Sequence, residues 1–226
     1  ARAVGIVAPP GMGKSRLRLE FLRSASQRYP GLVILLGRGD PMSTGSPYGI
    51  LGQALRRHCG LVGGEPRSVQ QDRLRERLGR SVPPAAGTRI SCFLGELCGV
   101  GFSSEADPAL HAARSDPKVM REQVTQAFLE WLTWQCRVAP LLLVLEDLHW
   151  GDTLSVQLIE QAVRELEELP LLLLVLGRPE VRELFPSFWN SRVLQEVPLR
   201  ALSRRASERL AQEVLRRALG SAVDAA

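Results

Sequence analysis

Long apolar runs are missing from this sequence of 226 residues, although 45% of its residues are hydrophobic. No run approaches the ~20 residues that a membrane-spanning helix needs. The first residues, Ala1 to Val4, also lack the basic start, apolar stretch and cleavage site of a secretory signal. We therefore expect a chain that neither spans a membrane nor is exported, and that works in the cytoplasm.

Cysteine is scarce, and no two of the four cysteines form a C-x-x-C pair. They fall inside apolar helical patterns rather than among histidines, so neither a zinc site nor a disulfide framework is predicted. We expect reduced thiols in the core of an intracellular protein. The cysteines are Cys59, Cys92, Cys98 and Cys136.

Lysine is rarer still, with only Lys14 and Lys118 in the sequence. Arginine therefore supplies nearly all of the positive charge, and the net charge of the chain is +5. A basic chain requires that a nucleic-acid surface be considered. The arginines are spread along the chain, however, and alternate with acidic residues, as in residues 72–77. This pattern is typical of a solvated helix face, so nucleic-acid binding is the less favoured interpretation.

What the sequence does contain is a series of short, continuous apolar runs separated by helical patterns. Continuous rather than alternating apolar character is typical of strands that are buried on both faces of a parallel sheet. The alternation of strands and helices predicts an α/β, doubly wound fold with a mainly parallel, five-stranded sheet. The expected strands are residues 4–7, 32–36, 141–145 and 171–176, with 193–197 as a weaker fifth.

Helices are expected after most of these strands, and two of them begin at aspartates that suit the N-cap position, Asp116 and Asp152. The helix after the first strand begins near Lys14. Its inward face is expected to carry Leu17, Phe21, Leu22 and Ala25.

Residues 41–137 form a segment too long for a simple crossover between the second and third strands. Within it, residues 99–117 are rich in Gly, Ser, Asp and Pro and predict an exposed loop. We expect a helical insertion in a single domain that occupies residues 1–226. Amphipathic patterns within the insertion lie near residues 50–58, 69–78 and 90–97.

The first turn of the chain, residues 8–15, reads Ala-Pro-Pro-Gly-Met-Gly-Lys-Ser. It matches G-x-x-x-x-G-K-[ST], the P-loop of NTPases, at every defined position except the first, where Ala8 replaces glycine. Backbone N–H groups of such a loop converge on a polyphosphate at the positive end of the helix that follows. Lys14 is expected to reach the β- and γ-phosphates of ATP, and Ser15 to bind Mg²⁺. The expected phosphate-binding residues are Gly11, Met12, Gly13, Lys14, Ser15 and Arg16.

Two carboxylates, Glu146 and Asp147, end the apolar run of residues 141–145, at the sheet edge where α/β proteins bind ligands. This is a Walker B pattern. Glu146 is expected to hold magnesium through water, and Asp147 to orient or deprotonate the water that attacks the γ-phosphate. The alternative is a strand that ends in two solvated acids.

Arg178 follows the next apolar run in the same way, so a cation there could contact the γ-phosphate. A surface pair between Arg178 and Glu180 is the alternative. His149 and Trp150 come directly after the acids, and we expect a partly buried turn that anchors the cap at Asp152 rather than a catalytic histidine.

Residues 145–152, Leu-Glu-Asp-Leu-His-Trp-Gly-Asp, resemble the AAA-like ATPase domains of the STAND class, the signal transduction ATPases with numerous domains. Such domains occur in multidomain bacterial Ser/Thr kinases and LuxR-type regulators. The resemblance extends over nearly the whole chain. Its other matching segments are residues 11–17, 39–41, 46–48, 178–180 and 198–203.

By this resemblance, Lys14 and Ser15 bind phosphate and metal, Glu146 and Asp147 form the Walker B site, and Arg178 is the sensor arginine. Family members cycle between ADP-bound and ATP-bound forms that assemble or release attached effector domains. The family's segment before the first strand and its helical domain after the last helix are missing, which implies a fragment of a larger protein.

The leading hypothesis is therefore a regulatory, slowly hydrolysing, Mg²⁺-dependent ATPase domain. Its expected partners are ATP, attached effector domains and, in nucleotide-dependent self-association, a second copy. A degenerate or nonhydrolysing nucleotide-binding scaffold is the alternative, favoured by Ala8. A nucleic-acid remodelling ATPase would require a focused basic face, which the sequence does not indicate.

Overall fold

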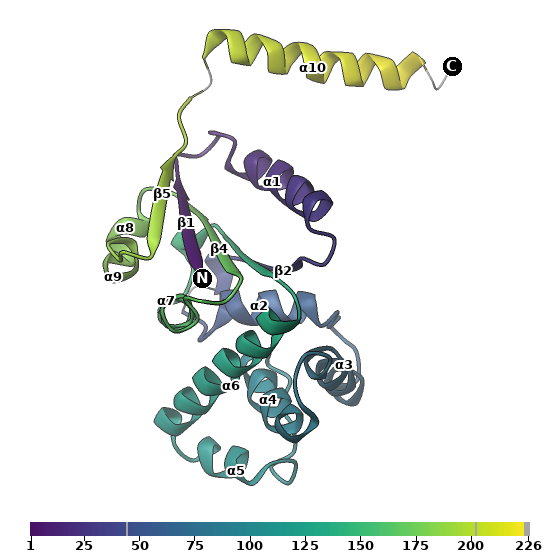
Figure 1. Ribbon diagram of the computed structural model, residues 1–226, viewed down its shortest axis with the longest axis vertical. Coiled ribbons are helices and arrows are strands. Elements are labelled where there is room, and N and C mark those ends of the chain that lie inside the picture. Colours follow the sequence, from purple (N-terminus) through teal and green to yellow (C-terminus); the bar gives the residue numbers. More distant parts are fainter. Residues whose placement is uncertain (44, 202, 224–226) are drawn as a thin grey trace.

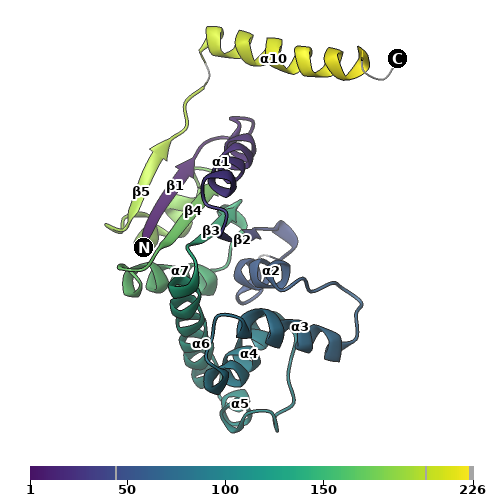
Figure 2. The same cartoon turned by 45° about the vertical axis from the view of Figure 1, so that its right-hand side comes forward.

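Five parallel strands form one sheet in the order β2-β3-β4-β1-β5 (Figures 1 and 2). The computed structural model describes residues 1–43, 45–201 and 203–223. The expected doubly wound α/β fold is confirmed, with every described strand pair parallel. The strands are β1 (Arg2–Val7), β2 (Val33–Arg38), β3 (Leu141–Glu146), β4 (Leu171–Gly177) and β5 (Leu194–Pro198).

The strands at the centre of the sheet are buried, as their apolar runs predict. The two edge strands are less buried. All residues of β3 are buried, whereas β5 has none that is buried and β2 is buried only in part. Alternate residues point to opposite faces, so Leu142 and Val144 pack on one side while Leu141 and Leu143 pack on the other.

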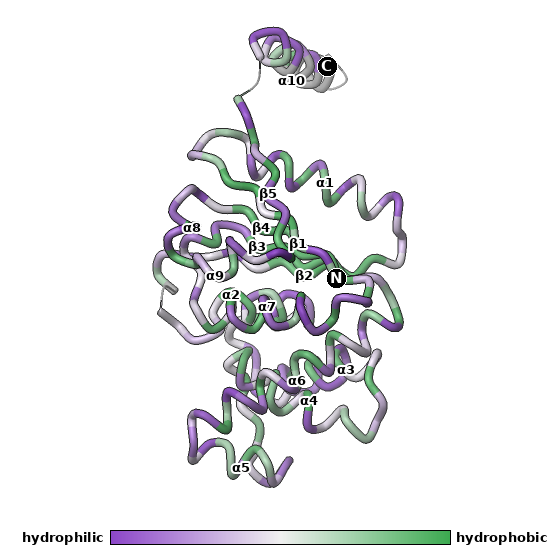
Figure 3. Tube along the Cα trace, turned by 60° about the vertical axis from the view of Figure 1, so that its left-hand side comes forward, coloured by the Kyte–Doolittle hydropathy of each residue, from purple (hydrophilic) through white to green (hydrophobic). Residues whose placement is uncertain are grey.

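One face of the sheet is covered by α1 (Lys14–Arg28), and the other by α2 (Gly49–His58) and α7 (Thr153–Glu165), as Figure 3 shows. The expected inward face of α1 is wrong in part, because Leu17 and Phe21 are 39% and 36% exposed. Leu22 packs on the sheet, but α1 has no fully buried residue. A single helix cannot cover a face this wide, so its flanking side chains stay in contact with water.

The segment between β2 and β3 is helical, as expected, and packs around its own large side chains. Trp131, Phe93 and Phe128 are fully buried there. The expected exposed loop over residues 99–117 is wrong in part: Asp107 caps a short helix that buries Leu110. The helices are α2, α3 (Arg67–Gly79), α4 (Pro84–Leu97), α5 (Pro108–Arg114) and α6 (Pro117–Val138), after a 3₁₀ turn at η1 (Pro41–Ser43).

The second half of the chain alternates as predicted. Asp152 caps α7, and its side chain accepts a hydrogen bond from the backbone N–H of Ser155. The last helix lies apart from the sheet (Figures 1 and 2). The remaining elements are η2 (Leu148–Trp150), α8 (Val181–Leu184), α9 (Pro186–Trp189) and α10 (Arg204–Val223).

The four cysteines are free and buried, as expected. Burial raises the pKa of Cys59 to about 12 and that of Cys136 to about 11, so these thiols are protonated at neutral pH. Among the helices that the structure describes, none is both long enough and apolar enough to cross a bilayer.

Candidate functional site

The turn between β1 and α1 has the backbone that a phosphate-binding loop requires. Gly11 and Gly13 have φ values of 79° and 86°, in the left-handed region that glycine adopts at low cost. Ala8, which replaces the first glycine of the motif, is buried and does not have a positive φ. Its N–H donates to the carbonyl of Gly177 on β4. The departure from the motif therefore causes no backbone strain.

The N-terminus of α1 presents donors to this turn. Gly13 occupies the N-cap position and no side chain caps the helix. The first helical bond is from the N–H of Leu17 to the carbonyl of Gly13, at 2.9 Å. The N–H groups that precede Leu17 in the first turn are those that a helix leaves without an internal acceptor, and an anion such as a phosphate can accept from them.

Lys14 folds back on its own loop. Its Nζ donates to the carbonyl oxygens of Ala8 at 2.6 Å and Pro9 at 3.0 Å. Partial burial lowers the pKa of Lys14, with Asp147 acting in the opposite direction and Arg178 in the same direction. These neighbours show that the lysine lies at the edge where β3 and β4 end.

The other predicted loop residues lie around this lysine. Met12 is half-buried, whereas Gly11, Gly13, Ser15 and Arg16 are exposed. The side chain of Arg16 pairs with Glu20, one helical turn away, at 2.7 Å. The backbone N–H of Arg16 lies in the first turn of α1, where a phosphate could accept a hydrogen bond from it.

Glu146 ends β3 and is 8% exposed. Its Oε1 lies 2.9 Å from Nε of Arg18 on α1, in an ion pair whose two side chains are largely buried. The geometry is not that of a directed hydrogen bond, since Arg18 Nε has no hydrogen-bond partner among the described residues. The acid predicted to hold magnesium is thus paired with an arginine from the helix that carries the loop.

Asp147 has a strained backbone, with φ 51° and ψ 42° in the left-handed region. Such strain persists only where the surroundings hold it, and it is frequent at functional sites. Here the N–H of Trp150 donates to the Asp147 carbonyl at 2.8 Å. The carboxylate of Asp147 also pairs with an arginine: Arg38 Nε lies 3.0 Å from Asp147 Oδ2.

Arg178 follows β4, between the ends of β1 and β3, and is half-buried. The alternative pair with Glu180 is not formed, since no ion pair of Arg178 is present in the part of the chain that the structure describes. The sheet order therefore brings Lys14, Asp147 and Arg178 to one edge, where Asp147 raises and Arg178 lowers the pKa of both Lys14 and His149. Sequence reasoning predicted this convergence.

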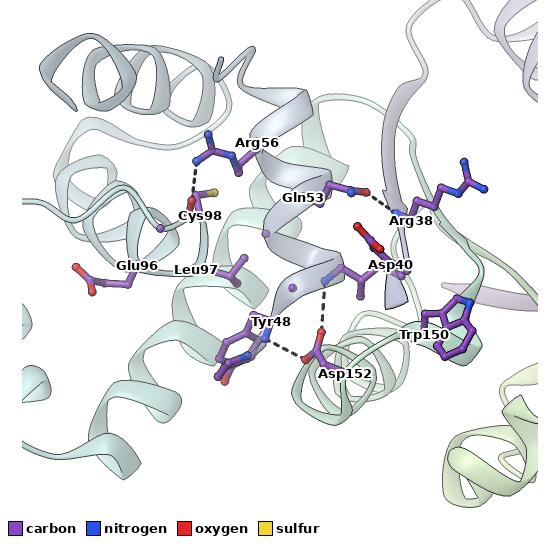
Figure 4. A pocket seen from close by; sticks show the side chains of 16 residues that line it. Arg38, Asp40, Tyr48, Gln53, Arg56, Glu96, Leu97, Cys98, Trp150 and Asp152 are labelled. Carbon is purple, nitrogen blue, oxygen red and sulfur yellow. Dashed lines mark hydrogen bonds between the residues drawn. The ribbon is translucent and has the colours of Figure 1, made fainter. Parts of the chain in front are cut away.

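His149 is 8% exposed, and neither of its ring nitrogens has a hydrogen-bond partner among the described residues. Burial and then Arg178 lower its pKa. It does not bond to the helix cap. The carboxylate of Asp152 instead accepts from the N–H of Tyr48 at 3.0 Å (Figure 4). It also accepts from the N–H of Ile50 at 3.3 Å and from the N–H and hydroxyl of Ser155.

Sequence reasoning missed Arg18 and Arg38, the partners of the two acids. A signal existed for both. Arg18 is four residues after Lys14 and so lies on the same face of the helix. Arg38 ends β2 and is in register with Glu146 on β3, so it emerges at the same sheet edge as Asp147 and Arg178.

Two oxygen-bearing side chains at this edge, those of Ser15 and Glu146, could contact a magnesium ion that is bound together with ATP. The described residues contain no cluster of three or more His, Cys, Asp or Glu side chains that could hold a metal ion. Mg²⁺ typically keeps several waters and is bound through one or two protein oxygens and the phosphates. Ser15 and Glu146 are the oxygen donors at this edge that could hold it.

Comparison with known proteins agrees with this geometry. Residues 1–175 match the family model described as "AAA ATPase domain". The chain belongs to this family. The matched part of this AAA ATPase domain contains the loop, both acids and β4 as far as Val175.

Two further proteins are similar to this AAA ATPase domain. An uncharacterized protein of Rhizobium meliloti (strain 1021) is 32% identical over 171 residues, which are 75% of this chain and 15% of that protein. The chain thus spans only a small part of the relative that it matches. The solved structure of VirB4 of Thermoanaerobacter pseudethanolicus aligns with 12% identity and a TM-score of 0.36, over 93% of this chain and 80% of that one.

Proposed function

We propose that this domain binds ATP with Mg²⁺, hydrolyses it slowly, and acts as a nucleotide-dependent switch within a larger cytoplasmic signalling protein. The observation that carries the proposal is the convergence of Lys14, Asp147 and Arg178 at the carboxyl edge of the sheet, beside an uncapped helix N-terminus. Membership of the AAA ATPase domain family supports nucleotide binding.

Each residue then has a chemical role. The loop N–H groups from Gly11 to Arg16 bind the phosphates, and Lys14 leaves its carbonyl partners to neutralise their charge. Ser15 and Glu146 would hold Mg²⁺, which would neutralise charge on the phosphates. Asp147 accepts a hydrogen bond from the attacking water and orients it.

The finer assignment is to the STAND class, in a bacterial protein whose attached effector domains respond to ADP or ATP. It rests on the resemblance of residues 145–152 and on the charged edge that would distinguish the two nucleotides. In this proposal residues 1–226 form one ATPase core with a helical insertion, joined to further domains and able to self-associate when ATP is bound.

A nonhydrolysing scaffold is the second candidate, and one observation favours it. Both acids are occupied by arginines, Glu146 by Arg18 and Asp147 by Arg38. If these pairs persisted with ATP bound, the acids could neither hold magnesium nor orient water.

Phosphate release from Mg-ATP separates the two candidates. We expect slow, saturable release by the wild-type protein, and a rate at least ~100-fold lower for Asp147→Asn because positioned bases contribute about 10² to 10⁴ in rate. ATP binding should survive in that variant. Asp72→Asn, at an exposed position on α3, is the matched control and should keep the wild-type rate.

Wild-type protein that binds ATP and releases no phosphate would support the scaffold instead. Equal rates for Asp147→Asn and the wild type would show that Asp147 does not orient the water.

A further inference from the structure

Asp152 caps two helices at once, and only 8% of the residue is exposed. Its Oδ1 accepts from the N–H of Tyr48, just before α2, at 3.0 Å (Figure 4). The same oxygen accepts from the N–H of Ser155 on α7 at 2.8 Å. Oδ2 accepts from the N–H of Ile50 on α2 at 3.3 Å and from the Ser155 hydroxyl at 2.7 Å. Each carboxylate oxygen therefore joins the start of α7 to the start of α2.

Ser155 extends this link between the two helices. It is fully buried, and its hydroxyl oxygen accepts from the N–H of Leu51 on α2 at 3.4 Å. Tyr48 occupies the N-cap position of α2, but its own side chain does not cap the helix. The first N–H groups of a helix have no acceptor within that helix. Those of α2 find acceptors on α7, so the two helices can separate only at the cost of buried, unpaired N–H groups.

A compact turn connects Asp152 to Asp147, the acid proposed to orient water. The N–H of Trp150 donates to the carbonyl of Asp147, and the N–H of Gly151 to that of Leu148, both at 2.8 Å. A Cβ at Gly151 would lie 2.9 Å from the carbonyl oxygen of Leu148, so the turn is tightly closed. The position of Asp152 therefore constrains the position of Asp147.

The backbone is strained at both ends of the link. Among the residues that the structure describes, Tyr48 and Asp147 are the two non-glycine residues with a positive φ, at 57° and 51°. Such conformations persist only where the surrounding contacts hold them. Asp152 bonds to the N–H of Tyr48 directly and reaches Asp147 through the turn. Loss of its carboxylate would therefore allow both residues to relax.

Close backbone contacts hold the same two segments against the end of β2. A Cβ at Gly37 would lie 2.5 Å from the carbonyl oxygen of Ile50, and a Cβ at Gly39 would lie 2.3 Å from that of Asp147. Contacts this close leave no room for a side chain. A displacement of α2 would thus be passed on to Asp147 rather than absorbed by loose packing.

We propose that Asp152 is a positioning residue for Asp147, and that it couples the first helix of the insertion to the hydrolysis of ATP. The inference rests on the proposed ATP-hydrolysing function. Misplacement of a reacting group by about 1 Å can cost about 10²-fold in rate. Movement of α2 would therefore change the rate of hydrolysis, whereas the phosphate loop, which lies between β1 and α1, would still bind the nucleotide.

The effect of Asp152→Ala on kcat and on affinity tests the inference, with kcat measured by phosphate release and the Kd of Mg-ATP by calorimetry. We expect kcat to fall at least about tenfold and the Kd to stay within about threefold, because a positioning contact acts on the chemical step and not on binding.

Asp107→Ala is the matched control. Asp107 is also an N-cap aspartate, but it caps only α5, through the N–H of Ala109 at 2.8 Å. Both variants should lower the urea midpoint, as the loss of a helix cap does, but Asp107→Ala should keep the wild-type kcat. An equal fall of kcat in both variants would show that Asp152 acts through general stability alone.

Asp152→Ser separates the two caps. Serine is a good N-cap residue for α7, but its side chain is too short to reach the N–H groups of α2 as well. We expect this variant to recover stability relative to Asp152→Ala and to keep the low kcat. Wild-type kcat in Asp152→Ser would overturn the inference, because the cap of α7 would then be sufficient.

A double-mutant cycle tests whether Asp152 acts through Asp147. In the Asp147→Asn background, Asp152→Ala should lower the rate by no more than about twofold, since the acid that it positions has already been removed. The full loss in this background would contradict the coupling.

The wild type decides whether the proposed function itself fails. Wild-type protein that binds Mg-ATP and releases no phosphate would refute hydrolysis, and the inference with it. Hydrolysis by the wild type with an unchanged kcat in folded Asp152→Ala would overturn the inference alone.

Discussion

The two faces of the sheet are built differently, although they share the same strands. On one face Leu173 of β4 is fully buried under a core that includes residues of α2, α7 and α9. On the other face its neighbour Leu172 is only partly buried, and α1 is the packed helix. A groove of about 720 Å³ remains there between α1 and the amino-terminal end of the sheet.

This difference separates stability from function. The well-covered face belongs to the larger core, which also includes the helical insertion and holds most of the buried apolar side chains; burial of such side chains dominates the folding free energy. The sparsely covered face carries α1, whose N-terminus forms the candidate phosphate site. Elements with few buried contacts open at low free-energy cost, and binding sites are often built on them. We expect α1 to adjust when nucleotide binds while the opposite face stays fixed.

Truncation of adjacent leucines on β4 should show the largest difference between the faces. We expect Leu173→Ala to lower the free energy of unfolding by about 3–5 kcal/mol, as for a fully buried leucine, and Leu172→Ala by about 1–2 kcal/mol. Urea denaturation followed by circular dichroism measures both. Equal losses would mean that the α1 face is packed as well as its opposite.

Acidification should lower the stability of the well-covered side through His58, the last residue of α2. The His58 ring lies edge-on to the Trp131 ring, with 5.7 Å between the ring centroids. Burial, with a smaller effect of Arg77, lowers the pKa of His58 from 6.5 to about 4. Between these values the unfolded chain binds a proton that the folded chain does not, so stability falls as the pH falls. Allowing for partial solvent screening, we expect a loss of roughly 1–2 kcal/mol from this group.

Urea denaturation at pH 7 and pH 5 measures this effect. For each protein, the quantity compared is the change in the free energy of unfolding between the two pH values. His58→Gln should reduce the loss on acidification. His111→Gln, at an exposed position on α5, serves as the control and should lose as much as the wild type. An unchanged pH dependence in His58→Gln would contradict the assignment.

The smallest effect is expected on the outer surface of α1. Leu19 is 52% exposed. Leu19→Ala should change the free energy of unfolding by no more than about 0.5 kcal/mol, as is usual for surface positions. A loss of 2 kcal/mol or more in urea denaturation would show that another part of the protein covers this side of α1 in solution.

Much of this architecture could be predicted from the sequence because periodicity and motif spacing are local. The continuous apolar runs predicted four strands, and a weaker pattern at residues 193–197 predicted the fifth, with bounds that differ by at most two residues. Gly11 and Gly13 have the backbone that the phosphate-loop motif implies. The convergence of Lys14, Asp147 and Arg178 followed from the rule that parallel strands end at one edge.

What the sequence did not predict depends on long-range geometry. The ion pair of Arg38 with Asp147 joins residues 109 positions apart, and its formation depends on β2 and β3 being neighbours. The exposure of Leu17 and Phe21 depends on how many helices share one face, which helical periodicity does not report. The short helix at residues 108–114 was not predicted, because the Asp and Pro residues that begin it are also common in loops.

The most direct test of the whole account is calorimetric titration of Mg-ATP into the wild type, Lys14→Ala and Lys118→Ala, the only two lysines of the chain. We predict saturable binding to the wild type and to Lys118→Ala, and a loss of at least ~100-fold in Lys14→Ala, since its ammonium neutralises phosphate charge. The folded state of each protein is checked by circular dichroism. Wild-type affinity in a folded Lys14→Ala variant would contradict the account, because ATP would then bind somewhere other than the loop before α1.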